Sequence, residues 1–178
     1  LATRPRQWTK NLLIYFAFLF TIGETWTIES LDHAVQLLYE CSLAFTCFCI
    51  LSSAVYIIND LVDVERDRQH PAKQFRPIAA GLISFNIALA FCLLLSIIGI
   101  VFAFSIGFYF GLVSSLYLLG MIAYSFYLKN VVILDVLIIS GGFVLRAVAG
   151  AVVLGVSISP WLYVCTSLGA LFIGFSKR

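Results

Sequence analysis

The chain has 178 residues, of which 62% are hydrophobic and only 11% are charged, and its mean hydropathy is +1.04. Soluble domains carry about 25% charged residues, so this composition excludes a soluble fold and indicates an integral membrane protein in contact with the lipid bilayer. The net charge of +2 gives no indication of a nucleic-acid partner.

Long apolar runs predict an all-α fold, a polytopic bundle of transmembrane helices. About 20 apolar residues in a helix cross a bilayer. Six spans can be drawn, at approximately residues 8–26, 34–58, 84–106, 108–128, 131–156 and 160–175. Short connections after the third, fourth and fifth spans require neighbouring helices to run antiparallel. We expect a single membrane domain over residues 1–178 that is a segment of a longer protein.

An acid-rich segment follows the second span and opens the longest polar stretch, residues 59–81. At about 100° per residue, four side chains share one helical arc of roughly 100°: Asn59, Asp60, Asp63 and Asp67. These carboxylates repel one another, and the dipole at a helix C-terminus disfavours them further. Their oxygens therefore indicate a bound cation, and they suit Mg²⁺ that holds substrate phosphates. The alternative is a solvated acidic helix end paired with Arg66 and Arg68.

The basic residues predict the orientation of the bundle. With six spans, ten of the eleven fall on one side: Arg4, Arg6, Lys10, Arg66, Arg68, Lys73, Arg76, Lys129, Lys177 and Arg178. The positive-inside rule assigns this side to the cytoplasm. We therefore expect a multi-pass protein of the cell membrane, with its N-terminus and its acid-rich segment on the cytoplasmic face.

Arg146 is the exception, because it lies inside the fifth span, eleven residues after Asp135. This spacing is about 17 Å along a helix and places both side chains on one face. A charge at that depth costs at least about 2.5 kcal/mol unless it faces a polar cavity or a partner. Two alternatives remain: a buried ion pair that locks the bundle, or a cytoplasm-facing cavity that holds an anion.

Acids with Mg²⁺, surrounded by Lys and Arg, form a site for a diphosphate or polyphosphate. Its place in a membrane bundle indicates that one substrate is a lipid. Lys73 and Arg76 follow the acids directly, and Tyr124 and Lys129 end the fourth span on the same side. The first pair is also explained by positive-inside topology, and the second by an interfacial aromatic with a snorkelling lysine.

The pattern Asn-Asp-x-x-Asp-x-x-x-Asp at 59–67 resembles the first Asp-rich motif of the UbiA superfamily of intramembrane prenyltransferases. Its position after the second span, Arg-Pro-Ile-Ala-Ala-Gly at 76–81 and Tyr-Ser-x-x-Leu-Lys at 124–129 fit that superfamily as well. Further segments are similar to the decaprenyl-phosphate phosphoribosyltransferase branch: Arg-Pro-Arg-Gln-Trp-Thr-Lys-Asn at 4–11, His-Pro-x-Lys-x-x-Arg-Pro-Ile-Ala-Ala-Gly at 70–81, Asp-Val-Leu at 135–137 and Leu-Arg-Ala-Val-Ala-Gly at 145–150.

The resemblance implies about nine spans in the whole enzyme, so residues 1–178 would be its N-terminal two-thirds. It implies Mg²⁺ as cofactor, held by Asn59, Asp60, Asp63 and Asp67. The phosphate-binding residues would be Lys10, Asn11, Lys73, Arg76, Tyr124, Lys129 and Arg146. Supporting residues would be Asp135, Lys177 and Arg178, the last two lying where a second polar motif should begin.

The implied reaction transfers a phosphoribosyl group from 5-phosphoribosyl diphosphate, a sugar diphosphate, to a polyprenyl phosphate and releases diphosphate. One alternative is prenyl transfer from a polyprenyl diphosphate to an aromatic or related acceptor, which would use the same metal site. An alternative of another class is a non-catalytic transporter, for which the intramembrane Asp135 and Arg146 would be the best evidence. The oligomeric state does not follow from the sequence.

Overall fold

The computed structural model describes residues 2–22, 26, 31–157 and 160–176, with the backbone alone described at 130, 132, 162, 173, 174 and 176. In chain order its elements are η1 (Pro5–Ile14), α1 (Tyr15–Phe20), α2 (Leu31–Val62), α3 (Val64–Gln69), α4 (Phe85–Ile106), α5 (Phe108–Phe126), η2 (Leu128–Asn130), α6 (Val132–Leu154) and α7 (Pro160–Ser176). The described residues contain no β-structure beyond one isolated bridge, between Ile22 and Trp26. The predicted all-α class is therefore confirmed.

Within the described part of the chain, four helices are long and apolar enough to cross a membrane: α2, α4, α5 and residues Ile133–Leu154 of α6. They correspond to predicted spans two to five. The sixth predicted span corresponds to α7, which has 17 residues. The first, predicted at 8–26, corresponds to η1 and α1, and its residues 23–25 lie outside the described part of the chain.

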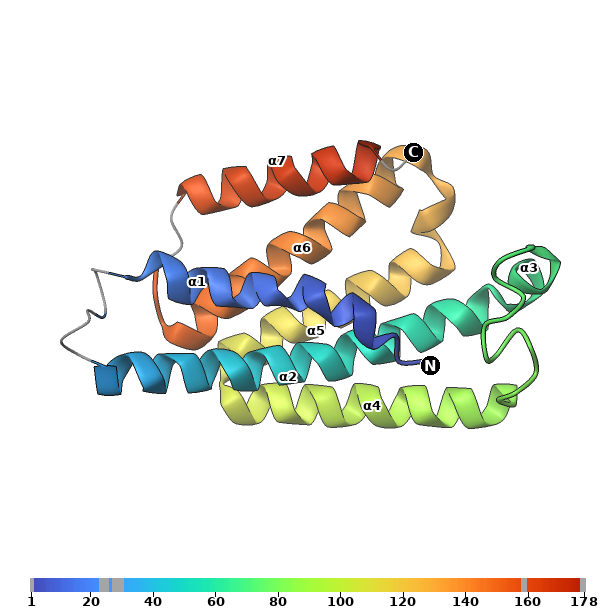
Figure 1. Cartoon of the computed structure of the whole chain (residues 1–178), viewed down its shortest axis with the longest axis horizontal. Helices are drawn as coiled ribbons and strands as arrows, with labels where there is room; N and C mark the ends of the chain where they lie inside the picture. Colours follow the sequence, from blue (N-terminus) through green and yellow to red (C-terminus); the bar gives the residue numbers. More distant parts are fainter. Residues whose placement is uncertain (1, 23–25, 27–30, 158–159, 177–178) are drawn as a thin grey trace.

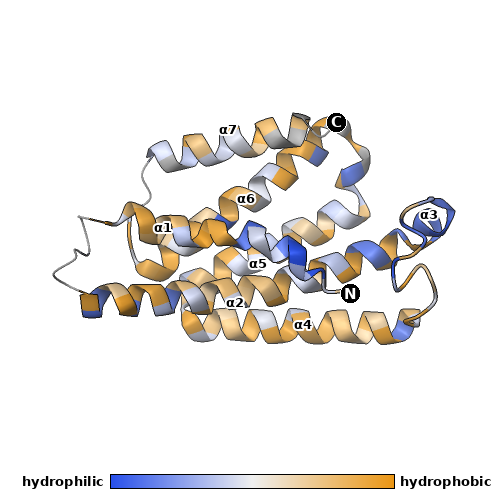
Figure 2. Ribbon diagram, in the orientation of Figure 1, coloured by the Kyte–Doolittle hydropathy of each residue, from blue (hydrophilic) through white to orange (hydrophobic). Residues whose placement is uncertain are grey.

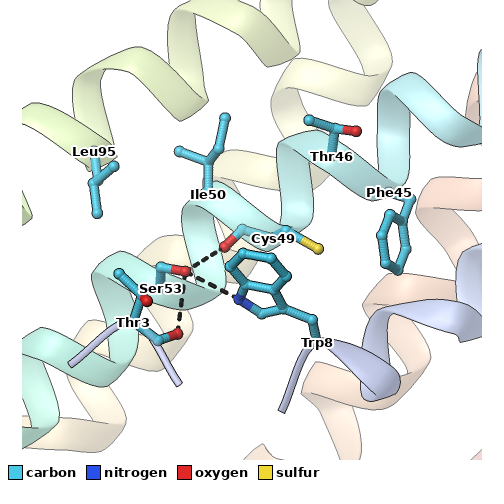
Figure 3. A pocket seen from close by; sticks show the side chains of 8 residues that line it. All are labelled: Thr3, Trp8, Phe45, Thr46, Cys49, Ile50, Ser53 and Leu95. Atoms are coloured by element: carbon cyan, nitrogen blue, oxygen red, sulfur yellow. Dashed lines mark hydrogen bonds between the residues drawn. The ribbon is translucent and has the colours of Figure 1, made fainter. Parts of the chain in front are cut away.

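The N-terminal segment differs from the uniform α-helix expected of a span, because a 10-residue 3-10 helix precedes the six residues of α1. Tertiary contacts hold this tighter geometry against α2. Trp8 Nε1 donates to Ser53 Oγ at 3.1 Å, and Ser53 Oγ lies 2.7 Å from the Cys49 carbonyl oxygen (Figure 3). This anchoring places Lys10 and Asn11, which belong to η1, inside the bundle.

The helices lie roughly side by side, with α2 against α4 and α5, and α6 between α5 and α7 (Figure 1). The core at their centre is aromatic and aliphatic, and it includes Phe48, Phe110 and Tyr117. Along α4, by contrast, large apolar side chains such as Leu93, Ile97 and Val101 are exposed. Contiguous exposed apolar surface is unfavourable in water, so this face of α4 suits lipid.

Hydrophilic residues gather around α3, the start of η1 and the connection between α5 and α6 (Figure 2). The loop at 70–83 is drawn against this end by Ile78, which is buried in a small cluster with Ile57 and Leu61 of α2. Gly81 ends the turn with φ +75°, a conformation that favours glycine. The buried Ile78 thereby brings Arg76 back over the acids.

Candidate functional site

The acid-rich segment keeps its helical arc although the regular helix is interrupted. Asn59 and Asp60 lie in the last turn of α2, Asp63 separates α2 from α3, and Asp67 lies in α3. The Asp63 amide donates to the Asn59 carbonyl at 3.0 Å, and the Asp67 amide donates to the Asp63 carbonyl at 2.8 Å. Helical spacing therefore continues through the junction, and Asp60 and Asp67 face the same partner.

That partner is Arg76. Its Nη1 lies 3.2 Å from Asp60 Oδ1 and 2.5 Å from Asp67 Oδ2. Arg4, at the start of η1, forms a second ion pair with Asp60 Oδ1. The Asp60 and Asp67 residues are each only 2% exposed, and buried carboxylates are stable only with such partners.

The sequence predicts an orientation role for Arg4 and includes it in a segment of family resemblance, but it does not predict this contact. Arg4 has φ +46°, a left-handed conformation that is unusual for a residue with a side chain. The N-terminal Arg-Pro-Arg run was the available signal, but the contact with Asp60 spans 56 residues of chain and cannot be read from local spacing.

The end of α5 and the short η2 that follows it supply the other contacts of the acid-rich segment. Lys129 Nζ lies 2.5 Å from Asp63 Oδ1. Ser125 Oγ donates to Asn59 Oδ1 at 2.5 Å. Tyr124 Oη donates to Asp135 Oδ1 at 2.7 Å, joining α5 to the first turn of α6. The end of the fourth predicted span and the residues just after it therefore bring Lys129 against Asp63 and Tyr124 against Asp135.

Two cavities adjoin the Tyr124–Asp135 hydrogen bond. The acidic-end cavity, of about 430 Å³, is lined by charged or polar side chains: Asp63, Arg66, Asp67, His70, Lys73, Tyr124, Lys129 and Asp135. The Arg146 cavity, of about 470 Å³, lies among η1, α2, α5 and α6, and its polar lining includes Lys10, Asn59, Tyr124, Asp135 and Arg146. The two cavities share Tyr124 and Asp135. Of these residues, His70 and Arg66 were not predicted to belong to the site.

Arg146 is 5% exposed and is held by neutral groups. Its Nε donates to Asn11 Oδ1 at 2.8 Å, its Nη1 to the Gly142 carbonyl at 2.7 Å and its Nη2 to Tyr117 Oη at 2.8 Å. Its guanidinium also lies over the Tyr117 and Phe143 rings. None of the ion pairs between described residues joins Arg146 to Asp135. The arrangement favours the cavity alternative over the ion-pair alternative.

The acidic end offers donors that fit Mg²⁺. Among the described residues no three His, Cys, Asp or Glu side chains converge to hold a metal by themselves. Mg²⁺ in phosphate sites, however, is held by one or two carboxylates together with substrate oxygens. Asp63 and Asp67 line the acidic-end cavity, and Asn59 and Asp60 adjoin them. Hard oxygen donors at an open cavity, with lysines nearby for the phosphates, have the chemistry that such a metal requires.

The remaining predicted residues divide into three groups. Lys73 lines the acidic-end cavity, and Lys10 lines the Arg146 cavity. Asn11 is fully buried and contacts Arg146, while Arg76 bridges the buried acids. Lys177 and Arg178 lie outside the described residues.

A separate cavity of about 350 Å³ opens beside Trp8, Phe45 and Leu95 (Figure 3). It shares no lining residue with either of the site cavities. Its lining includes no acidic or basic side chain, so it offers no phosphate-binding group and we exclude it from the site.

The chain is similar to known proteins in both sequence and fold. The sequence model of the UbiA prenyltransferase family matches residues 32–176. The chain is 39% identical to a decaprenyl-phosphate phosphoribosyltransferase of Mycolicibacterium smegmatis, over 99% of this chain and 54% of that protein. It is 36% identical to the protein of the same name from Mycobacterium tuberculosis H37Rv, over 99% of this chain and 57% of that protein.

A solved UbiA homologue from Archaeoglobus fulgidus, bound to DMAPP and Mg²⁺, matches with a TM-score of 0.75 and 25% identity. The match covers 96% of this chain and 59% of that one. The chain thus spans little more than half the length of the relatives that it matches.

Proposed function

The chain belongs to the UbiA prenyltransferase family, and we propose that it forms part of an enzyme that transfers a phosphoribosyl group from 5-phosphoribosyl diphosphate to a polyprenyl phosphate. The observation that carries this proposal is the acidic-end cavity, where Asp63 and Asp67 share a lining with Lys73 and Lys129. The names of the relatives with 36% and 39% identity support the same reaction. The proposed setting is the cell membrane, with this cavity open to the cytoplasm.

The proposed role of the acidic-end cavity is to hold the diphosphate of the donor. Asp63 and Asp67, with Asn59 and Asp60 beside them, would hold Mg²⁺ there. When bound, Mg²⁺ supplies positive charge that stabilises a departing diphosphate. Lys73 and Lys129 add fixed cations at the same cavity, and Lys129 can exchange its contact with Asp63 for a phosphate oxygen.

Arg4 and Arg76 have a supporting role, because they pair with the buried acids. They neutralise Asp60 and hold it in place, and Arg76 does the same for Asp67. The proposed task of this pair is to balance the charge of two largely buried carboxylates.

The transfer itself requires few protein groups. A phosphate oxygen of the lipid attacks the anomeric carbon, and the bond from that carbon to the diphosphate oxygen breaks. The electron pair leaves with diphosphate. The attacking phosphate is already an anion, so no general base is needed. In the Arg146 cavity, Lys10 and Arg146 provide cationic charge for a second phosphate group, and Asn11 and Tyr117 hold Arg146 in position.

A second candidate is prenyl transfer to an aromatic or related acceptor, because the structural relative from A. fulgidus was solved with DMAPP. Transport without catalysis is disfavoured by membership of a prenyltransferase family. The deciding experiment offers the full-length natural protein two donors in membranes with Mg²⁺. We expect labelled 5-phosphoribosyl diphosphate to yield a lipid-linked phosphoribose with decaprenyl phosphate. Exclusive use of a prenyl diphosphate with an aromatic acceptor would overturn the proposal.

A further inference from the structure

One hydrogen bond lies where the acidic-end cavity meets the Arg146 cavity. Tyr124 Oη donates to Asp135 Oδ1 at 2.7 Å, and both residues line both cavities. Tyr124 comes from the end of α5, and Asp135 lies in the first turn of α6, where the helix dipole favours a carboxylate. The two helices thus hold a carboxylate at the boundary between the cavities.

The charge of Asp135 is unexpected at this boundary. Arg66, Lys73 and Lys129 line the acidic-end cavity, where bound Mg²⁺ would offset the charge of its two other aspartates, and Lys10 and Arg146 line the Arg146 cavity. Both cavities therefore suit anions, but a carboxylate repels a phosphate that is placed against it. Asp135 is suited instead to a part of the ligand that carries no charge and donates hydrogen bonds, because an ionised carboxylate only accepts them.

An apolar chain is a poor neighbour for the Asp135 carboxylate. It would remove water from the carboxylate and return no hydrogen bond, which is costly for a charged group. A sugar ring has the required chemistry, since its hydroxyl groups donate to a carboxylate. In 5-phosphoribosyl diphosphate, such a ring is joined directly to the diphosphate that the acidic-end cavity would hold.

We propose that Asp135, positioned by Tyr124, is a specificity-determining residue that accepts hydrogen bonds from the donor's sugar hydroxyls and disfavours an allylic prenyl donor. This inference rests on the proposed function, because it assigns the diphosphate of that donor to the acidic-end cavity. It adds a residue whose task is to recognise the transferred group rather than the leaving group.

The test measures ligand binding by the full-length natural protein, purified in detergent with Mg²⁺. The probes are 5-phosphoribosyl diphosphate, ribose 5-phosphate and inorganic diphosphate. The variants are Asp135→Asn, Asp135→Leu and Tyr124→Phe. Glu65→Gln is the matched control, because Glu65 is an exposed carboxylate that pairs only with Arg68 in the described contacts.

We expect Asp135→Leu to weaken binding of both ribose-containing probes by about tenfold or more, since a lost hydrogen-bonding group discriminates strongly at a site built for it. Asp135→Asn should give a smaller loss, because one acceptor oxygen remains. Tyr124→Phe keeps the ring and removes only the positioning hydroxyl. It should therefore also weaken binding of the ribose-containing probes, but by less than Asp135→Leu does. Binding of inorganic diphosphate should not weaken in either Asp135 variant, and Glu65→Gln should leave the binding of all three probes at the wild-type level.

Three results would overturn the inference. The first is an equal loss for diphosphate and for the ribose-containing probes. The second is a loss that additional Mg²⁺ restores, which would make Asp135 a metal ligand. The third is unchanged binding of every probe in both Asp135 variants. Failure of the proposed function would look different: the wild-type protein would bind a prenyl diphosphate and not 5-phosphoribosyl diphosphate.

Discussion

Arg146 Nε donates a hydrogen bond to Asn11 Oδ1 at 2.8 Å, joining η1 to the middle of α6 across 135 residues of chain. Asn11 is fully buried, so this bond satisfies an amide oxygen that has no access to water. It also aims the guanidinium, which lines the Arg146 cavity. The position of the Arg146 charge in the cavity therefore depends on how η1 packs against α6.

Substitution of Arg146 should separate the two alternatives that the sequence leaves open. Arg146→Met strands the Asn11 and Tyr117 oxygens, and we expect it to lower the free energy of unfolding by about 1–3 kcal/mol. Adding Asp135→Leu should not restore stability, since Asp135 bonds to Tyr124. Adding Asn11→Leu should restore part of it. Thermal unfolding in detergent gives the stability of the wild type, the single variant and the two double variants. Restored stability on adding Asp135→Leu would instead indicate an ion pair.

The crossing of η1 and α6 requires a glycine. A Cβ added to Gly150 would overlap the backbone carbonyl of Ile14, which cannot move as a flexible side chain could. Gly150→Ala should therefore destabilise the protein by about 1–3 kcal/mol. Gly141→Ala on the same helix is the matched control, because a Cβ there meets nothing within 4 Å and alanine favours a helix. Equal unfolding temperatures for the two variants would contradict the close approach.

Spans two to five could be predicted from long apolar runs, and the acidic arc from helical spacing, because both are local properties of the sequence. Span three was placed at 84–106, and α4 covers Phe85–Ile106 with Ser84 as its N-cap. The bond from Arg146 to Asn11 and the pair of Arg4 with Asp60 could not be predicted in this way. They join residues far apart in the chain, and the spacing of residues in one helix carries no information about its partner. The 3-10 geometry of η1 also depends on such tertiary contacts.

Asp60 and Asp63 should respond differently to loss of charge, although they are three residues apart. Asp60 is 2% exposed and pairs with both Arg4 and Arg76. Asp60→Asn leaves these arginines with less neutralising charge, and we expect a loss of about 1–3 kcal/mol in the free energy of unfolding. Asp63 has a 26% exposed side chain, so Asp63→Asn should change stability little. Denaturant titration of both variants tests the difference, and an equal loss would refute it.

The orientation can be tested by labelling single cysteines in intact cells. His70 and Ser157 are exposed and lie at opposite ends of the predicted topology. The background should lack Cys165, because it is the exposed cysteine among five and the other four are buried. A membrane-impermeant reagent should label Ser157→Cys and not His70→Cys. The reverse pattern would place the acidic-end cavity outside the cell and remove its access to cytosolic sugar phosphates.

The central claim is that the acid-rich segment is a Mg²⁺-dependent phosphate site that drives transfer. The most direct measurement is the rate of phosphoribosyl transfer to decaprenyl phosphate by the full-length protein, with Asp63→Asn and Glu65→Gln compared at saturating Mg²⁺. We predict that Asp63→Asn lowers the rate by about a hundredfold or more while the protein stays folded. Glu65→Gln should keep the wild-type rate, and chelation of Mg²⁺ should abolish transfer in both. Near wild-type turnover by Asp63→Asn would contradict the assignment of the site.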